Sequence, residues 1–420
     1  MDLWHNVAFF YLVTTVIKFA VIAGFVLTVA ALLTWMERRQ SAYMQDRMGP
    51  HRASFFSFRG KPVTLWGLVH VIADSTKMLF KEPFMPGAAD AFVFQLAPAV
   101  GFVSSLMIMA FVPFGPDLHT GLEAPWDVIP LQLVRVDGGL LWILAMGSLG
   151  IYGTALAGWS SNNKFALLGG IRASAQSVSY EIALGLTLVG MLMVSGSSEL
   201  SAMLEVQRGD ILGGWLPRWG LFLQPVGAML YFIAAMAETK RAPFDMPEGE
   251  SEIIGYFVEY SSMGFGLFML GEFVEVVVLA ALFSTVFLGG WMPPGMAVDG
   301  SVHLGPLTLA AGSVGLALLG MATFAFKVLL MCVLQLQVRW TLPRFRYDQL
   351  MDVGWKMLLP WSLVNMVVSM AAIWWDPTFT KLLQLNGVLT FLFVLVVAAG
   401  PKRTERAAPQ GMALGDSHGH

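Results

Sequence analysis

Apolar runs that recur along the whole chain constrain its fold more than any other feature of the sequence. A run of about 20 apolar residues can cross roughly 30 Å of hydrocarbon as a helix. We predict about nine such spans, at about residues 7–35, 92–114, 138–159, 180–196, 222–239, 262–288, 307–336, 355–375 and 383–400. The composition agrees, because 56% of the residues are hydrophobic and only 13% are charged. The sequence therefore predicts an all-α polytopic membrane protein, with residues 1–400 forming a single transmembrane helical domain.

The basic residues predict how the chain is oriented. With the N-terminus outside, the alternating connections place eighteen Lys and Arg residues inside and four outside. Such a bias is typical of inside segments, so we expect the N-terminus outside and the C-terminus inside. The first apolar run ends in Glu37-Arg38-Arg39 and not in a small-residue cleavage site, which argues against a cleavable signal peptide. The polar tail, residues 401–420, is predicted to be disordered.

The first inside connection is predicted to contain a helix that lies in the membrane interface. Residues 64–82 show helical periodicity, and His70, Asp74, Lys77 and Lys81 form one polar stripe on an otherwise apolar surface. This pattern is typical of an interfacial amphipathic helix, which we place after the first span. An ordinary interfacial face explains the stripe; the alternative is a helix that gates a lipophilic substrate.

Cysteine and histidine usage excludes several classes of site. The single Cys332 lies inside an apolar run, so no disulfide framework and no cysteine ligand set for an iron–sulfur cluster exists. The seven His residues are scattered, and we predict no metal site. Any electron-transfer cofactor is therefore expected in a partner.

The segment between the fifth and sixth spans is the strongest indication of function. It holds six acidic side chains (Glu238, Asp245, Glu248, Glu250, Glu252 and Glu259) against Lys240 and Arg241. Pro243 and Pro247 preclude a regular helix at its start. We expect helix to resume near Glu250, which would place Glu252, Tyr256, Glu259 and Met263 on one face. Closely spaced carboxylates in a low-dielectric site cannot all ionise, so such a set can hold and release protons. A solvated loop neutralised by Lys240 and Arg241 is the alternative.

Three further carboxylates fall inside predicted spans and favour the functional interpretation. Glu181 lies at the start of the fourth span, and Glu272 and Glu275 share one face of the sixth. Carboxylates at membrane depth commonly serve ion or proton transfer, because burying them is costly. For Glu275 the alternative is a pair with Lys327 or Lys18, which also lie in spans.

Two basic segments complete the candidate features. Arg38, Arg39, Arg47 and Arg52 are mostly explained by the positive-inside rule, although one or two of them could face a cavity or a polar ligand. The late inside segment 339–348 is basic and aromatic. It is typical of either a membrane anchor or a docking face for an acidic partner, and the sequence does not separate these.

Five blocks in order resemble a known family. They are Glu37–Pro50, Ala73–Glu82, Ser179–Glu181, Ala237–Glu252 with Val258–Tyr260, and Arg339–Gln349. The string Glu-Thr-Lys-Arg-Ala-Pro-Phe-Asp is especially specific. Together the blocks resemble the quinone-site membrane subunit of respiratory complex I, the family of NADH-quinone oxidoreductase H subunits, over residues 37 to 360. The ninth span and the tail match it weakly.

The resemblance implies a membrane subunit of a proton-pumping NADH:quinone oxidoreductase in the bacterial inner membrane. It would form the quinone chamber with a peripheral arm and couple quinone reduction to proton translocation. Its implied partners are the iron–sulfur and quinone-site subunits of that arm, small and antiporter-like membrane subunits, the lipid bilayer and ubiquinone or menaquinone. Iron–sulfur clusters and FMN would belong to partner subunits, and no nucleic acid is implied.

The resemblance also assigns roles to individual residues. The residues implied on the chamber side are Arg38, Arg47, Asp74, Lys77, Arg241 and Phe244. The acidic coupling loop would hold Glu248, Glu250 and Glu252. The residues implied on the proton path are Glu181, Glu238, Glu259 and Glu272.

Two rival functions remain at the level of the sequence. A homologous membrane subunit of an energy-converting hydrogenase would keep the fold and the carboxylates but lose the quinone contacts. A stand-alone proton-coupled transporter would need broken helices at the membrane midplane and no soluble partner.

Overall fold

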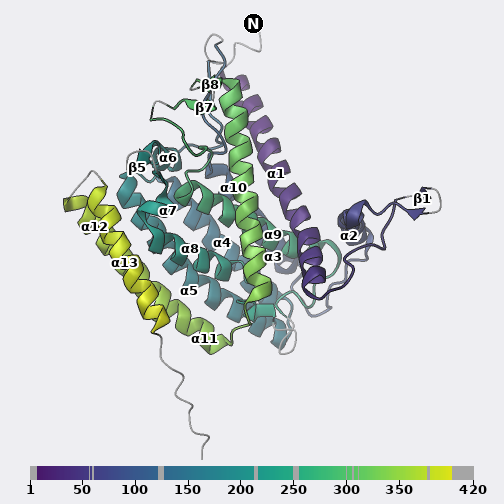
Figure 1. The fold of residues 1–420 in the computed structure, drawn as a ribbon. Helices are drawn as coiled ribbons and strands as arrows, with labels where there is room; N and C mark the ends of the chain where they lie inside the picture. The colour runs from purple at the N-terminus through teal and green to yellow at the C-terminus, as the bar shows by residue number, and fades with distance from the viewer. Residues whose placement is uncertain are drawn as a thin grey trace, which may run out of the picture.

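The computed structural model describes residues 7–55, 57–58, 61–121, 127–211, 216–248, 255–298, 300–304, 307–310, 312–375 and 379–399. These residues form a helical bundle with small strand pairs in its loops (Figure 1). The helices are α1 (Val7–Met44), α2 (Val69–Phe80), α3 (Ala91–Ile108), α4 (Gly139–Ser160), α5 (Lys164–Ser195), α6 (Leu200–Val206), α7 (Gly220–Leu223), α8 (Pro225–Glu238), α9 (Ser262–Phe287), α10 (Val314–Thr341), α11 (Tyr347–Asp352), α12 (Leu359–Trp375) and α13 (Thr380–Ala398). The tail, residues 401–420, lies outside the described residues.

Short antiparallel pairs close the loops at the ends of the bundle. They are β1 (Ser57–Phe58) with β2 (Lys61–Pro62), β3 (Leu118–His119) with β4 (Val128–Ile129), β5 (Asp210–Ile211) with β6 (Leu216–Pro217), and β7 (Val302–Leu304) with β8 (Leu307–Leu309). Single turns of 3₁₀ helix occur at η2 (Leu65–Gly67), η3 (Met109–Phe111) and η4 (Met246–Glu248), and a π-helical turn, η5 (Val353–Leu358), joins α11 to α12.

Eight helices among the described residues are long and apolar enough to cross a membrane. They are α1, α3 with η3, α4, α5, α9, α10, α11 with η5 and α12, and α13. The all-α polytopic fold is therefore confirmed. In Figure 1, α1 runs beside α10 on one side of the bundle, and α12 and α13 lie together at the opposite edge.

The fifth predicted span, 222–239, is a broken helix. Its main part, α8, has 14 residues, about 21 Å of helix, and the four-residue α7 precedes it. Gln224 separates the two, because Pro225 has no N–H with which to continue the helix. Polar side chains form hydrogen bonds at this break. Asn386 of α13 donates to the Leu223 carbonyl at 2.7 Å, and Gln224 donates to Ser369 of α12 at 2.8 Å.

The fourth predicted span is also different, because α5 begins at Lys164 and not near residue 180. Its first half is rich in polar side chains, which interrupt the apolar run in the sequence. Inside the bundle some of these side chains form hydrogen bonds. Gln176 is fully buried and its amide donates to the carbonyls of Ala237 and Phe244, both at 2.8 Å. The helix therefore continues where hydropathy alone predicts a loop.

Small residues let α3, α4 and α5 approach closely. A Cβ placed on Gly153 of α4 would lie 2.7 Å from the Gly101 nitrogen and 3.0 Å from the Ala97 oxygen of α3. On the next turn, a Cβ on Gly158 would lie 2.6 Å from the Ala166 oxygen of α5. Backbones can approach this closely in a membrane bundle only where side chains are absent.

The centre of the bundle is α9, which packs against α1, α3, α8 and α10. Residues 273–287 are buried almost without interruption, with Glu275 half-buried among them. A helix whose surface is apolar on all sides is buried on all sides. Because Glu272 and Glu275 belong to α9, they lie in the interior of the bundle.

The predicted amphipathic helix corresponds to α2, which projects sideways from the end of α1 (Figure 1). It covers Val69–Phe80, a shorter range than the predicted 64–82, because residues 65 and 66 have positive φ and turn the chain. Its far end is attached to α9, since Ser262 donates to the Met78 carbonyl at 3.0 Å. Its place in the membrane interface stays a prediction.

Replacing Gly153 by Ala should destabilise the protein by about 1–3 kcal/mol, because the new methyl group meets backbone atoms that cannot yield. The melting temperature of the detergent-solubilised protein measures this effect. Gly185→Ala is the matched control, since its Cβ would only contact Leu144 at an ordinary 3.6 Å. Equal melting temperatures for the two variants would refute the close-approach argument.

Candidate functional site

Four carboxylates from three helices line one cavity inside the bundle, which we call the carboxylate cavity. They are Glu181 of α5, Glu238 at the end of α8, and Glu272 and Glu275 of α9. Lys240, Tyr256, Thr154 and Ser105 add polar groups to a wall that is otherwise apolar. The cavity has a volume of about 70 Å³, whereas one water needs roughly 10–15 Å³. The space is therefore polar enough and large enough to hold water between the carboxylates.

Hydroxyl groups orient two of these carboxylates. Ser148 of α4 donates to Glu181, and Tyr256 donates to Glu272 at 3.0 Å. One oxygen of Glu238 is buried and has no hydrogen-bond partner among the described residues. Such an oxygen is costly unless it is protonated or meets water, so Glu238 is the carboxylate best placed to exchange a proton with the cavity.

The alternative partners considered for Glu275 are excluded by the structure. The Lys327 ammonium donates to the carbonyls of Leu288, Gly290 and Met292 beyond the end of α9, and Lys18 donates to the carbonyls of Pro130 and Gln132. The Glu275 side chain instead lines the carboxylate cavity. The alternative pairing of Glu275 with Lys327 or Lys18 is therefore wrong, because both amines donate to backbone carbonyls instead.

A second cluster, the arginine junction, lies beside the cavity and consists of Glu37, Arg241, Arg339 and Glu272. Both guanidinium groups form ion pairs with the same oxygen of Glu37. Arg241 also lies 3.8 Å from Glu272, and its guanidinium covers the Phe273 ring at 3.7 Å. The Arg241 side chain is only 8% exposed. Two cations and two carboxylates neutralise one another here, which makes their burial tolerable.

The predicted chamber-side residues do not form one cluster. Arg38 and Asp74 form an ion pair between α1 and α2. Arg47 is exposed beside a surface hollow with Arg39 and His51, and Lys77 is exposed on α2. Arg241 is buried in the arginine junction, nearer the carboxylates than expected.

Phe244 is also buried, with its ring 5.9 Å from the ring of Tyr180 and 5.4 Å from that of Phe345. In this structure it packs inside the protein and lines none of the cavities described here.

The acidic segment is only partly described. Glu248 ends the 3₁₀ turn η4, and Glu250 and Glu252 lie outside the described residues. The helix predicted to run from Glu250 through Tyr256 and Glu259 is wrong for residues 255–261, which form turns before α9 starts at Ser262. Gly255 has φ of 126°, and Ser262 has φ of 55°, so the backbone changes direction twice here. Hydrophobic spacing could not reveal these turns.

Glu259 lies apart from the carboxylate cavity. Its carboxylate accepts a hydrogen bond of 2.6 Å from Asn163, the residue that caps the start of α5. Glu259 is therefore half-buried at the end of the bundle, and the cavity reaches the other three predicted path residues without it.

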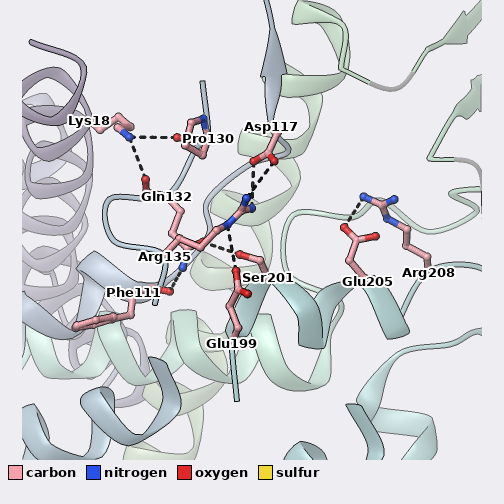
Figure 2. Close-up of polar contacts among 10 residues, drawn as sticks. All are labelled: Lys18, Phe111, Asp117, Pro130, Gln132, Arg135, Glu199, Ser201, Glu205 and Arg208. Carbon is pink, nitrogen blue, oxygen red and sulfur yellow. Dashed lines mark hydrogen bonds and ion pairs between the residues drawn. The ribbon is translucent and has the colours of Figure 1, made fainter. Parts of the chain in front are cut away.

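A separate polar cluster lies around α6 and the neighbouring loops (Figure 2), at the end of the bundle opposite α11 (Figure 1). Arg135 points between Asp117 at 3.3 Å and Glu199 at 3.1 Å, and Arg208 pairs with Glu205 at 2.7 Å. Burial raises the pKa of Glu205, an effect that Arg208 opposes and Asp117 reinforces. None of the cluster's charged residues lines the carboxylate cavity.

Sequence reasoning missed Glu37, Arg339, Tyr256 and Ser148 as members of the site. In the sequence, Glu37 and Arg339 are only charges that flank spans, although they lie beside Arg241 in space. No local signal could pair them, because 204 residues separate Glu37 from Arg241 and 302 separate it from Arg339. Within the described residues, no group of three or more His, Cys, Asp or Glu side chains could hold a metal ion.

The fold and site together define a polytopic helical membrane protein that encloses carboxylates within its bundle. A sequence model of the family described as NADH dehydrogenase matches residues 17–370.

Curated relatives from several bacteria are named as H subunits of NADH-quinone oxidoreductase. The Geobacter sulfurreducens relative, the second H subunit of that organism, is 42% identical over 354 residues, which cover 84% of this chain and 94% of the relative. The Bdellovibrio bacteriovorus relative is 38% identical over 372 residues, with the same coverage. The Flavobacterium johnsoniae relative is 38% identical over 364 residues, covering 86% of this chain and 94% of the relative.

The chain belongs to this family, that of the NADH-quinone oxidoreductase H subunits. With its eight long apolar helices among the described residues, it is a multi-pass protein of the bacterial inner membrane. The family model ends at residue 370, so α13 lies beyond the matched region.

Replacing Arg241 by Gln should lower the free energy of unfolding by about 3 kcal/mol, because it removes one partner of a buried ion pair. Arg339→Gln should cost less, since the Arg339 side chain is 25% exposed and can be hydrated. Thermal unfolding of both variants in detergent compares them. The cost of the double substitution Glu37→Gln with Arg241→Gln should differ from the sum of the two single costs, because both side chains belong to one ion-pair cluster. Strict additivity would contradict the shared junction.

Proposed function

We propose that this chain is the membrane subunit of a proton-pumping NADH:quinone oxidoreductase and couples quinone reduction to proton translocation through the carboxylate cavity. The observation that carries the proposal is the convergence of Glu181, Glu238, Glu272 and Glu275 on one cavity. Carboxylates at this depth are costly to keep, and proton transfer is a common reason for keeping them.

The arginine junction supplies the physical connection between the two halves of the function. Arg241 stands between Glu37, which it pairs with, and Glu272, which is 3.8 Å away. A change of charge near Glu37 shifts the Arg241 guanidinium toward Glu272. Glu37 tolerates this shift, because Arg339 stays paired with its carboxylate and neutralises it. The charge on Glu272 then alters the proton affinity of its neighbours in the cavity. Energetic coupling requires a movable group that both sites bias, and we propose Arg241 as that group.

The quinone side of the site is proposed at the end of the bundle that carries α2. Arg38, Asp74, Arg47 and Lys77 lie there at the surface, where polar groups could meet a quinone head with the peripheral arm above them. The acidic loop with Glu248, Glu250 and Glu252 belongs to the same end by sequence. Glu259 is proposed at the margin of the proton path, and Phe244 as packing support for the chamber wall.

The assembly and orientation follow from the same proposal. We place this end on the cytoplasmic side and the N-terminus outside, as the positive-inside bias favours. The partners are the iron–sulfur and quinone-site subunits of the peripheral arm and the small and antiporter-like membrane subunits. Ubiquinone or menaquinone is the substrate, and the partners hold FMN and the iron–sulfur clusters.

The names of the relatives favour this function over the rivals. They are called subunits of NADH-quinone oxidoreductase, which supports a quinone enzyme over an energy-converting hydrogenase. A stand-alone transporter would function without other subunits, whereas the relatives are named as parts of a complex. Co-purification with iron–sulfur proteins and quinone-dependent NADH oxidation would support the proposal, and activity as an isolated monomer would oppose it.

Glu238→Gln should slow quinone-linked proton translocation by on the order of tenfold or more without preventing assembly, because an amide keeps the shape but cannot carry the proton. Charge transfer by the reconstituted complex after quinone addition measures the effect. Glu275→Gln should behave in the same way, since both side chains line the cavity.

Glu205→Gln serves as the matched control, because it removes a carboxylate at the opposite end of the bundle. Its charge transfer should match that of the unaltered complex. Normal rates in Glu238→Gln and Glu275→Gln would overturn the role of the carboxylate cavity.

A further inference from the structure

The late basic and aromatic segment, residues 339–346, is largely exposed but is attached to the bundle. It begins in the last turn of α10, which ends at Thr341, and continues to the start of α11 at Tyr347. On the way it lies against the start of the acidic segment. We call residues 241–248 the coupling loop. The segment contacts this loop at Pro243, Phe244 and Asp245. The two functions considered for the segment from sequence alone, membrane anchor and docking face, do not account for these contacts.

Arg344 attaches the segment to the coupling loop at two points. Its Nε lies 2.8 Å from the Asp245 carboxylate, and its Nη2 donates to the Asp245 backbone carbonyl at 3.1 Å. The next residue adds a backbone link, because the Phe345 N–H donates to the Pro243 carbonyl at 3.2 Å. A guanidinium that binds both a side chain and the backbone of one residue fixes its orientation more firmly than a simple ion pair.

Ring packing holds the same loop from the side of the bundle. The Phe345 and Phe244 rings are stacked, with centroids 5.4 Å apart and an interplanar angle of 24°. Phe244 in turn packs against Tyr180, whose hydroxyl donates to the Leu350 carbonyl of α11 at 2.7 Å. Gln176 of α5 binds the Phe244 carbonyl. The coupling loop is thus enclosed between α5 and the segment 339–346.

The beginning of the segment reaches the loop through a shared carboxylate. Arg339 and Arg241 both pair with Glu37, so the first residue of the coupling loop and the first residue of the segment are fixed relative to each other. Arg339 therefore touches the proposed coupling machinery directly, whereas Arg344 touches only the loop.

We propose that residues 339–345 of this segment form a clamp that positions the coupling loop, with Arg344 as its positioning residue. The inference rests on the proposed function, because it assigns the clamp to the loop that joins the quinone side to the carboxylate cavity. The clamp keeps Arg241 directed at Glu37 and Glu272 while the protonation of the site changes. It acts on turnover, since Arg344 contacts Asp245, whereas Arg38 and Asp74, two of the residues proposed to meet quinone, pair with each other.

Arg344→Gln in the intact complex tests the clamp, with Arg346→Gln as its matched control. Arg346 has the same charge and lies in the same segment, but its side chain is 80% exposed and pairs only with Asp348 among the described residues. We expect amide hydrogen exchange in residues 241–248 to accelerate on the order of two- to fivefold in Arg344→Gln and to stay unchanged in Arg346→Gln. Equal exchange in the two variants would overturn the clamp.

Steady-state kinetics separate a positioning role from a general loss of structure. Per assembled complex, kcat with quinone should fall on the order of two- to fivefold in Arg344→Gln while the apparent quinone KM stays the same. The charge exchange Arg344→Asp with Asp245→Arg should recover part of kcat, and Arg344→Lys should recover less, because an ammonium cannot bind two groups as a fork. An unchanged kcat in Arg344→Gln, or a charge exchange that is no better than the single changes, would refute the proposal.

Failure of the clamp and failure of the proposed function give different results. If Glu238→Gln turns over normally, the proton path itself is wrong, whatever Arg344 does. If Glu238→Gln is slow while Arg344→Gln equals Arg346→Gln in exchange and in kcat, only the clamp is wrong.

Discussion

The rest of the site depends on the ion pairs that the Glu37 carboxylate forms with Arg241 and Arg339. Glu37 lies near the end of α1 and pairs with Arg241 from the loop after α8 and with Arg339 near the end of α10. Separate burial of these charges would cost several kcal/mol each, so their mutual neutralisation requires the three chain segments to meet. That meeting places Arg241 between Glu37 and Glu272, and it brings the ends of α1, α8 and α10 against α9.

Close packing around α9 makes the carboxylate cavity possible. Glycines at 101, 153, 158 and 170 let α3, α4 and α5 approach at backbone distance on one side of the cavity. The same helices contribute Ser148 and Glu181, so the small residues that tighten the packing also bring polar groups to the interior. The low dielectric of an apolar bundle strengthens the electrostatic interactions between charges within it. Small shifts of one charge can therefore alter the proton affinity of the next.

The residues that carry the family resemblance form two separate groups in the structure. Glu181, Glu238, Glu272 and Glu275 surround the cavity, whereas Arg38, Asp74, Arg47 and Lys77 lie at the surface near α2. The arginine junction and the coupling loop connect these two groups. Segment 339–346 belongs with the connection, because its contacts are made to Pro243, Phe244 and Asp245. The polar cluster around Arg135 at the opposite end has no charged residue in the cavity and ties the loops there together.

The sequence by itself determined that the chain is an all-α membrane bundle, and it predicted that Glu181, Glu272 and Glu275 fall within its apolar helices. Hydropathy and charge are local properties of the sequence, and they determine which segments are stable inside a bilayer. They therefore predict helices and buried carboxylates well. Tertiary structure alone decided where α5 begins, that residues 255–261 turn, and that Glu275 faces the cavity and not Lys327. It also decided that Glu37 holds Arg241 and Arg339. These features depend on which distant groups satisfy each other in space, as Gln176 does for the carbonyls of Ala237 and Phe244. Local periodicity carries no information about such partners.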